Sequence, residues 1–210
     1  MPPVLRLYED TLANDGAELS LPARPYVIYV VHGSIAVAGR MVGSDQGFGG
    51  EDAAHIKGGP EGATLWRWEF AADGSPSVVS HEKFVARLDA LPQGPLLLRG
   101  DSVAFPPGGC AYLHRHQGPG IRCLLEGGIR IDTHGRSTSY GPGSPWFEAG
   151  PEPVFAQATD RPTRFIRTMV LPMAYLARSS VEYLREEDKA KPKTQSYKIY
   201  ADMPMKRSGT

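Results

Sequence analysis

Two histidines one residue apart, His114 and His116, are the side chains in this sequence best placed for chemistry. We read residues 111–116 as a β-strand. Because side chains alternate between the two faces of a strand, both imidazoles face one side and Arg115 faces the other. Imidazole nitrogens suit Fe, Mn, Ni, Cu and Zn, so the pattern predicts a mononuclear site for a divalent transition metal. A pair of histidines that is only structural is the alternative.

The residues that follow are expected to form a hairpin with this strand. Residues 117–120 would make a tight turn and residues 121–126 the return strand, which places Arg122 opposite His114 on the inner face. A buried arginine needs an anionic partner. That partner is either Glu126, in an internal ion pair, or the carboxylate or phosphate of a small acidic ligand.

Two imidazoles alone bind a metal weakly, and catalytic sites often have three protein ligands and one open position. The sequence leaves the third ligand open, although Cys110 and Glu126 would share the inner face of the hairpin with the histidines. The candidates are Cys110, Glu126, Glu148, Glu152, His32, His55 and His134.

The two cysteines of the chain are predicted to be free thiols. By alternation Cys110 points inward and Cys123 points outward, so their sulfur atoms cannot meet in a disulfide. Two cysteines are also too few to form a disulfide scaffold in a chain of 210 residues.

Charge and hydropathy exclude several classes of protein. Lys+Arg and Asp+Glu both number 23, so no positive excess is available to neutralise nucleic acid. The longest apolar run, residues 26–31, is far shorter than the about 20 residues that span a bilayer. The first ten residues lack the pattern of a signal peptide. We expect a cytoplasmic protein that binds neither nucleic acid nor membranes.

Turn-forming residues punctuate the chain, which has 24 Gly and 19 Pro among its 210 residues. Short stretches rich in Val, Ile and aromatic residues lie between them, as is typical of an all-β sandwich or barrel. Helices are expected only over residues 81–91 and 174–187, and residues 198–204 are expected to lie extended on an outer strand or a partner surface. The expected strands are 26–31, 34–38, 63–70, 96–99, 102–105, 111–116, 121–126, 128–132, 154–158 and 165–171.

An internal repeat divides the chain into two similar halves. Each half has a strand, a glycine turn, an aromatic turn and a strand that carries an arginine. Those arginines are Arg67 and Arg167, which we interpret as residues on the rim or the outer sheet surface. The matching segments are 30–37 with 124–131, 47–50 with 145–148, and 66–69 with 166–169.

The segment around the two histidines resembles the first motif of the cupin family. That motif has Gly, five residues, His-x-His, three or four residues, Glu, six residues and Gly. Here Gly108, His114, His116 and Gly127 fit every spacing, but the Glu position holds Gly120. The resemblance therefore covers two of the four family metal ligands, His114 and His116, and this motif lacks its carboxylate.

The second cupin motif is more degenerate. If Gly150 is its inner glycine, then Glu148 stands at the proline position, Pro153 at the histidine position and Gln157 at the asparagine position. The fourth family ligand is thus also missing.

The resemblance implies a cupin-type β-barrel, or jelly roll, with two tandem cupin-like halves and a few short helices. A degenerate half would span residues 1–92, with Ser20 and Pro22 where the histidine pair would lie. The half with the His-x-His motif would span 93–175, and a C-terminal extension 176–210. Exposed barrel edges and the apolar extended terminus favour a homodimer.

The resemblance also implies a function. It suggests a metal-dependent dioxygenase, isomerase, decarboxylase or lyase that acts on or binds a small acidic metabolite. His114 and His116 would hold the metal, Arg122 would orient the acid, and Tyr112 or Glu126 would transfer protons. The alternative is a sensor that binds a small molecule without metal or catalysis.

Overall fold

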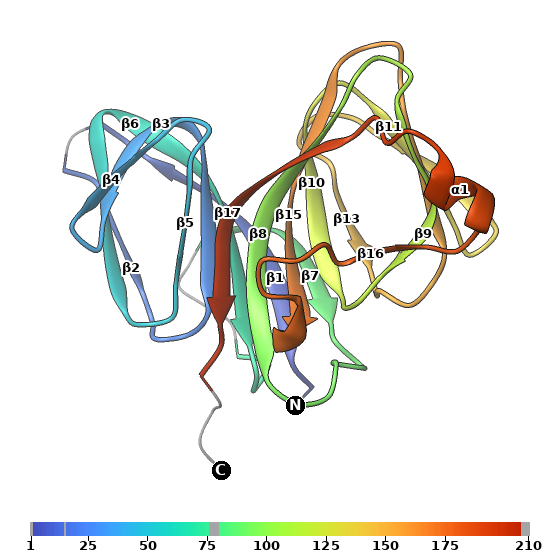
Figure 1. Ribbon diagram of the computed structural model, residues 1–210. Helices are drawn as coiled ribbons and strands as arrows, with labels where there is room; N and C mark the ends of the chain where they lie inside the picture. Colours follow the sequence, from blue (N-terminus) through green and yellow to red (C-terminus); the bar gives the residue numbers. More distant parts are fainter. Residues whose placement is uncertain (1, 15, 76–79, 207–210) are drawn as a thin grey trace.

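The computed structural model describes residues 2–14, 16–75 and 80–206, and strands make up most of it (Figure 1). The predicted all-β class is therefore confirmed. The strands before residue 92 are β1 (Val4–Leu12), β2 (Glu18–Leu21), β3 (Tyr26–Val37), β4 (Arg40–Gly43), β5 (Gly47–Gly50), β6 (Ala54–Ala71) and β7 (His81–Arg87). The later elements are β8 (Leu96–Phe105), β9 (Cys110–His116), β10 (Gly120–Glu126), β11 (Ile129–Thr133), β12 (Arg136–Tyr140), β13 (Pro145–Glu148), β14 (Val154–Ala158), β15 (Thr163–Pro172), the 3-10 turn η1 (Met173–Tyr175), β16 (Val181–Tyr183), α1 (Glu186–Ala190) and β17 (Ser196–Pro204).

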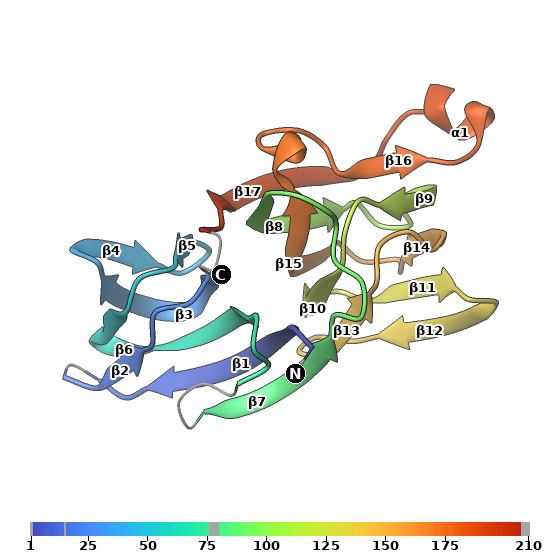
Figure 2. The same cartoon turned by 90° about the horizontal axis from the view of Figure 1, so that it is seen from below.

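These strands form three sheets (Figure 2). Strands β1 to β7 make one seven-stranded sheet with the order β4-β3-β6-β1-β7, in which β2 also pairs with β6 and β5 with β3. The later strands make two five-stranded sheets, β13-β10-β15-β8-β17 and β12-β11-β14-β9-β16. The two five-stranded sheets enclose an interior of their own, as in a jelly roll.

Alternation along single strands sorts side chains between two cores. On β10, Ile121 and Cys123 pack against the seven-stranded sheet, in a core that also contains Trp68. Arg122 and Leu124, on the other face of β10, point into the space between the two five-stranded sheets. The strand is thus buried on both sides, and its inner face can carry a functional side chain.

The expected hairpin between the histidine strand and the next strand does not form. β9 pairs with β14 and β16, whereas β10 pairs with β13 and β15 in the other five-stranded sheet. The short link between them crosses from one sheet to the other. Residues 111–116 and 121–126 are therefore strands, as predicted, but the predicted pairing between them is wrong. Local sequence does not encode which sheet a strand joins.

Both long helices expected from the sequence are wrong. Residues 81–87 form β7, which pairs along the edge of β1 with Phe84 opposite Leu7. The free edge of β1 offers backbone hydrogen bonds and an apolar core, and this tertiary setting overrides the helical pattern. Residues 174–187 are divided among η1, β16 and the start of α1.

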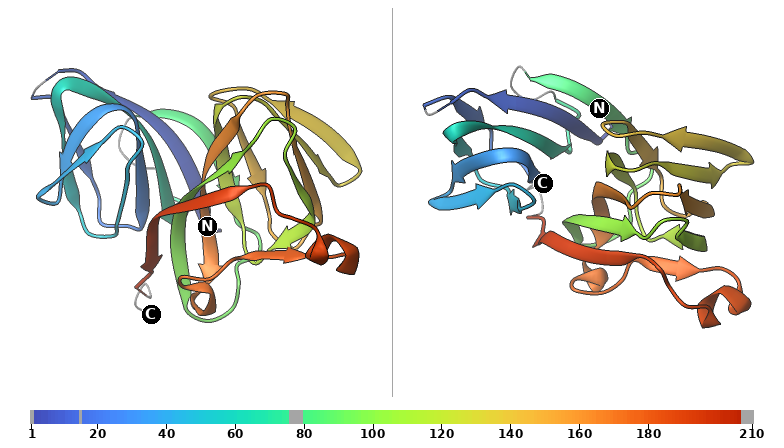
Figure 3. Two further views of the ribbon diagram at one scale, coloured as in Figure 1. Left: turned by 45° about the horizontal axis from the view of Figure 1, so that its top comes forward. Right: turned by 90° about the horizontal axis from the view of Figure 1, so that it is seen from above.

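The C-terminal residues complete the outer edges of both five-stranded sheets (Figure 3). β16 pairs with β9, where Val181 lies opposite His116 and Tyr183 opposite His114. β17 pairs with β8 over most of its length, which confirms the expectation of an outer strand. No helix among the described residues is long and apolar enough to cross a membrane.

The cysteines are free, as predicted. Cys123 lies on the face of β10 that points out of the barrel, as alternation predicts, but that face is covered and not open to solvent. It is fully buried in the core between the seven-stranded sheet and β10, where burial raises the pKa of its thiol to about 12. Cys110 is only partly buried.

Candidate functional site

β9 carries the two histidines into the barrel formed by the five-stranded sheets. His114 is 4% exposed and His116 is 5% exposed, and both line an internal cavity. Arg115, between them, faces outward and makes an ion pair with Glu182. This is the alternation expected of a strand.

The two imidazole rings meet edge to face, with centroids 4.8 Å apart and an interplanar angle of 84°. The Nε2 atoms of His114 and His116 are 3.3 Å apart. Nδ1 of His114 lies 2.7 Å from the carbonyl oxygen of Tyr112. Because a carbonyl can only accept, Nδ1 carries the proton, and Nε2 presents its lone pair to Nε2 of His116. Histidines that bind metals are commonly oriented by such a bond at the other ring nitrogen.

A carboxylate from β13 lies in the same cavity as the two histidines. Glu148 is 8% exposed, and its Oε2 lies 3.1 Å from Nε2 of His116 and 2.8 Å from Nη2 of Arg122. Its other oxygen, Oε1, accepts a hydrogen bond of 2.9 Å from Nε1 of Trp146. Elements of both five-stranded sheets therefore bring two imidazoles, one carboxylate and one guanidinium together.

The expected ion pair between Arg122 and Glu126 is wrong. Arg122 is fully buried, pairs with Glu148, and donates through Nη1 to the carbonyl oxygen of Gly120 at 2.7 Å. Glu126 has a side chain that is 56% exposed and pairs with Arg164 at 3.0 Å. The register of β10 against β15 shifts just before Glu126, and this irregularity breaks the alternation that would have turned Glu126 inward.

Burial sets the protonation of the cluster. It lowers the pKa of His114, and it lowers the pKa of His116 to about 3, so both imidazoles are neutral at pH 7. Burial would raise the pKa of Glu148, but the charge of Arg122 and the hydrogen bond from His116 outweigh it and hold that pKa below its usual value. Burial lowers the pKa of Arg122 to about 10, which leaves it charged. Neutral imidazole is the form that binds a metal.

The cavity is small, with a volume of about 20 Å³. A second ion pair borders it, in which Arg167 binds Asp101 through Nε at 2.6 Å and through Nη2 at 3.0 Å. Two arginines and two carboxylates balance to zero charge, and a space of this size holds an ion or a water. The rest of the wall consists of Val103, Phe105, Ala111, Ile131, Val154, Ala156, Phe165, Val181 and Tyr197.

Tyr112 does not face the cavity. Its ring lies outside, 4.9 Å from Nζ of Lys191 and 5.4 Å from Nζ of Lys193. Only its backbone carbonyl takes part in the site, through His114. The structure therefore does not bring the side chains of Tyr112 and Glu126, both predicted to transfer protons, to the histidines.

Of the candidate third ligands, Glu148 alone lines the cavity among the described residues. It pairs with Arg122, and among the described residues no group of three or more His, Cys, Asp or Glu side chains is placed so that it could hold a metal ion. The candidates that lie elsewhere are Cys110, Glu126, Glu152, His32, His55 and His134.

Sequence reasoning missed the partnership of Glu148 with Arg122. The two residues lie on neighbouring strands, β13 and β10, with Trp146 directly opposite Arg122 in the register. No motif contains this spacing. The only signal in the sequence was a carboxylate at a second-motif position where cupins have proline.

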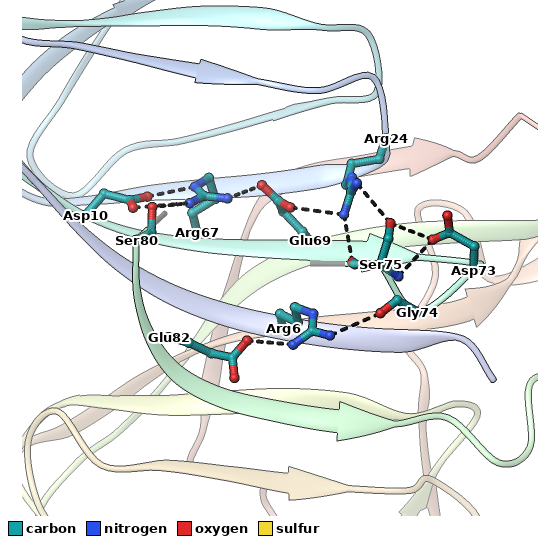
Figure 4. A network of polar contacts seen from close by, with 10 residues as sticks. All are labelled: Arg6, Asp10, Arg24, Arg67, Glu69, Asp73, Gly74, Ser75, Ser80 and Glu82. Carbon is teal, nitrogen blue, oxygen red and sulfur yellow. Dashed lines mark hydrogen bonds and ion pairs between the residues drawn. The ribbon is translucent and has the colours of Figure 1, made fainter. Parts of the chain in front are cut away.

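The interpretation of Arg67 and Arg167 as rim or surface residues is also wrong. Arg67 is completely buried, and Arg167 is 4% exposed. Figure 4 shows Arg67 between two carboxylates, Asp10 and Glu69, with Ser80 also bound to the guanidinium. Each arginine is thus stabilised by an internal ion pair in place of water, and this attraction offsets the free energy of desolvation.

The cluster around Arg67 continues toward the surface. Arg24 lies 3.7 Å from Oε2 of Glu69 and donates to the carbonyl oxygen and the hydroxyl of Ser75 (Figure 4). Both arginines of this cluster, Arg24 and Arg67, have protein partners. We therefore read it as a structural network and not as a ligand site.

Comparison with known proteins identifies the fold. No family profile matches this chain, and no curated protein matches it in sequence. Among solved structures, the oxalate decarboxylase of Lactobacillus farciminis, in a formate complex, superposes with a TM-score of 0.67 at 12% identity, over 90% of this chain and 82% of that one.

Two further structures agree. AerE of Microcystis aeruginosa gives a TM-score of 0.59 at 13% identity, over 82% of this chain and 89% of that one. A cupin 2 conserved barrel domain protein of Leptotrichia buccalis gives 0.50 at 12% identity, over 80% and 84%. At these identities the likeness shows the fold alone, and that fold is the cupin-type β-barrel expected from the sequence.

Proposed function

We propose that this protein holds a divalent transition metal on His114 and His116 inside its cupin barrel and acts on or binds a small carboxylic acid beside it. The observation that carries the proposal is the meeting of both imidazoles and the Arg122 guanidinium in one buried cavity. A structural pair of histidines would not need a charged arginine at the same cavity.

The residues fit a metal. Both imidazoles are neutral, and His114 is oriented through Nδ1 so that its Nε2 lone pair faces the second ring. The cavity has room for an ion. When bound, such an ion would polarise an oxygen of the ligand as a Lewis acid.

The charge balance favours an acid as the second ligand. The ion pairs of Arg122 with Glu148 and of Arg167 with Asp101 leave the cavity neutral. A divalent ion would bring it to a charge of about +2 in a low-dielectric site, which an anion compensates. Arg122 would orient a carboxylate there. The same balance disfavours the metal-free sensor, because an acid would then meet no uncompensated positive charge.

Known structures of the same fold suggest which acids to try. The L. farciminis protein is named as an oxalate decarboxylase and was solved with formate. The cavity described here has room for one ion or one water, so an acid beside the metal requires the cavity wall to move. Formate, the smallest carboxylic acid, is therefore the first probe and oxalate the second.

We also infer that the chain is a bicupin, with halves at 1–92 and 93–175 and an extension at 176–210. Arg67 binds Asp10 and Arg167 binds Asp101, each through Nε and Nη2. The pairings β1 with β6 and β8 with β15 that hold these ion pairs correspond in the two halves. The expected homodimer is supported by Ile199, 48% exposed on the edge strand β17.

Replacing either histidine is expected to abolish metal binding. Protein purified without added metal should contain close to one equivalent of Fe, Mn, Ni, Cu or Zn by elemental analysis. His114→Ala and His116→Ala should each retain less than about a tenth of it, because one imidazole alone binds too weakly to survive purification. The matched control is His134→Ala, an exposed histidine. If the unaltered protein and the three variants all contained the same amount of metal, the proposed metal site would be wrong.

Removing Arg122 is expected to weaken acid binding. Titration calorimetry with formate should show binding to the metal-loaded protein and none to the metal-free protein. Arg122→Lys, which keeps the charge but loses the planar fork, should bind formate about tenfold more weakly. The exposed Arg130→Lys serves as control. Formate binding that is equal with and without metal would favour the sensor instead.

A further inference from the structure

A second hollow, separate from the inner cavity, lies where the two five-stranded sheets end. β12 is the edge strand of one sheet and β13 is the edge strand of the other (Figure 2). The hollow lined by β11, β12 and β13, here called the outer pocket, has a volume of about 420 Å³. Pockets that hold small organic molecules span about 300–1,000 Å³. The walls of the outer pocket include Thr133, His134, Arg136, Thr138, Tyr140 and Trp146.

Alternation along the hairpin of β11 and β12 decides which side chains enter the outer pocket. Thr133 lies opposite Arg136 in the register, and both line the pocket. Arg130 and Asp132 lie on the opposite face of the same hairpin, where they form an ion pair with each other. Within the part of the chain that the structure describes, no hydrogen bond or ion pair engages the guanidinium of Arg136.

The outer pocket has a net positive charge. Arg136 supplies it, and no aspartate or glutamate among the described residues lines the pocket. The inner cavity differs, because two carboxylates there match two arginines. A guanidinium without a counter-ion favours a carboxylate, which can accept two parallel hydrogen bonds from its planar fork.

An aromatic wall lies beside this charge. The rings of Tyr140 and Trp146 stack with centroids 4.8 Å apart and an interplanar angle of 24°, and both line the pocket. Trp146 is buried, whereas Tyr140 is only partly buried, so part of the wall is open to a ligand. Aromatic rings pack well against other flat rings in such offset arrangements. A flat apolar body that carries a carboxylate matches both walls of the pocket.

We propose that the outer pocket binds an aromatic carboxylate, with the carboxylate on Arg136 and the ring against Tyr140. This site goes beyond the function proposed above and needs no metal in the inner cavity. Ile131 lines both hollows, and Trp146 lines the outer pocket while its Nε1 donates to Glu148 of the inner cavity. These two side chains form the wall that separates the sites.

Titration calorimetry with naphthoate tests the outer pocket. The unaltered protein, without added metal, should bind naphthoate, and Arg136→Gln should bind it about tenfold more weakly because the charged hydrogen bonds are lost. Naphthamide has the ring without the charge, and acetate has the charge without the ring. Each should bind the unaltered protein at least about tenfold more weakly than naphthoate does.

The matched control is Arg130→Gln, which removes an exposed arginine from the opposite face of the same hairpin. It should bind naphthoate like the unaltered protein. Thr138→Phe fills the pocket from an exposed position on β12 and should abolish naphthoate binding without changing the circular dichroism spectrum.

Crossed measurements separate this site from the proposed function. Arg136→Gln should leave the affinity for formate unchanged, and Arg122→Lys should leave the affinity for naphthoate unchanged. If Arg122→Lys weakens naphthoate binding and Arg136→Gln does not, the ligand lies in the inner cavity and the outer pocket is not its site.

Three other results would overturn the proposal whatever the inner cavity binds. Naphthoate does not bind, or binds equally to the unaltered protein and to Arg136→Gln. Naphthamide binds as tightly as naphthoate, so the charge is not recognised. Light scattering shows a dimer that Thr138→Phe dissociates, so a second copy of the chain covers the pocket.

Discussion

Asp101→Asn is expected to lower the free energy of unfolding by about 3–5 kcal/mol. Asp101 and Arg167 have side chains only 4% exposed and meet through two hydrogen bonds. The substitution leaves the buried guanidinium charge of Arg167 without its carboxylate partner. Urea denaturation followed by tryptophan fluorescence measures the loss.

Asp132→Asn is the control that isolates the effect of burial on the free energy of unfolding. Asp132 also binds an arginine, Arg130, but their side chains are 30% and 47% exposed, so the loss should stay below about 1 kcal/mol. Replacing both buried partners, as Asp101→Leu with Arg167→Met, should cost less than Asp101→Asn alone because no charge is then stranded. Equal losses for Asp101→Asn and Asp132→Asn would contradict the burial argument.

Gly118→Ala is expected to lower the free energy of unfolding by about 3 kcal/mol, the upper part of the range for overpacking. A Cβ atom at Gly118 would lie 2.0 Å from the carbonyl oxygen of Val170 in β15. Gly150 also packs closely against Gly118, since its own Cβ would lie 2.8 Å from the carbonyl carbon of Gly118. The link from β9 to β10 would have to shift, and with it the spacing of the histidines from Arg122.

Gly141→Ala is the control for this substitution. Gly141 is exposed, and a Cβ atom there would have no neighbour within 4 Å. Its effect should be within about 0.5 kcal/mol. If Gly118→Ala unfolds at the same urea concentration as Gly141→Ala, the close approach of β15 does not restrain the link.

The fold class and the inward face of the histidine strand follow from patterns that lie within single strands. Turn residues mark the strand ends, and alternation places His114 and His116 on one side whatever the strand pairs with. These features need no knowledge of distant residues, which is why they could be predicted.

Features that depend on which strands become neighbours could not be predicted. The hairpin assignment put Arg122 beside Glu126, whereas the true neighbour of β10 is β13, whose carboxylate is Glu148. The expected helix over residues 81–91 was wrong for the same reason. Its residues form a strand because the edge of β1 is open to them, and nothing in the segment itself indicates that edge. The buried pairs of Arg67 and Arg167 likewise depend on aspartates about 60 residues away.

The C-terminal strands give the barrel an order of assembly. The cavity wall includes Val181 and Tyr197, and β9 gains its outer neighbour only when β16 is in place. During synthesis, a chain that has emerged as far as β15 has every histidine, arginine and carboxylate of the site but an open barrel. An ion can therefore load before β16 and β17 pair with β9 and β8 and close the barrel.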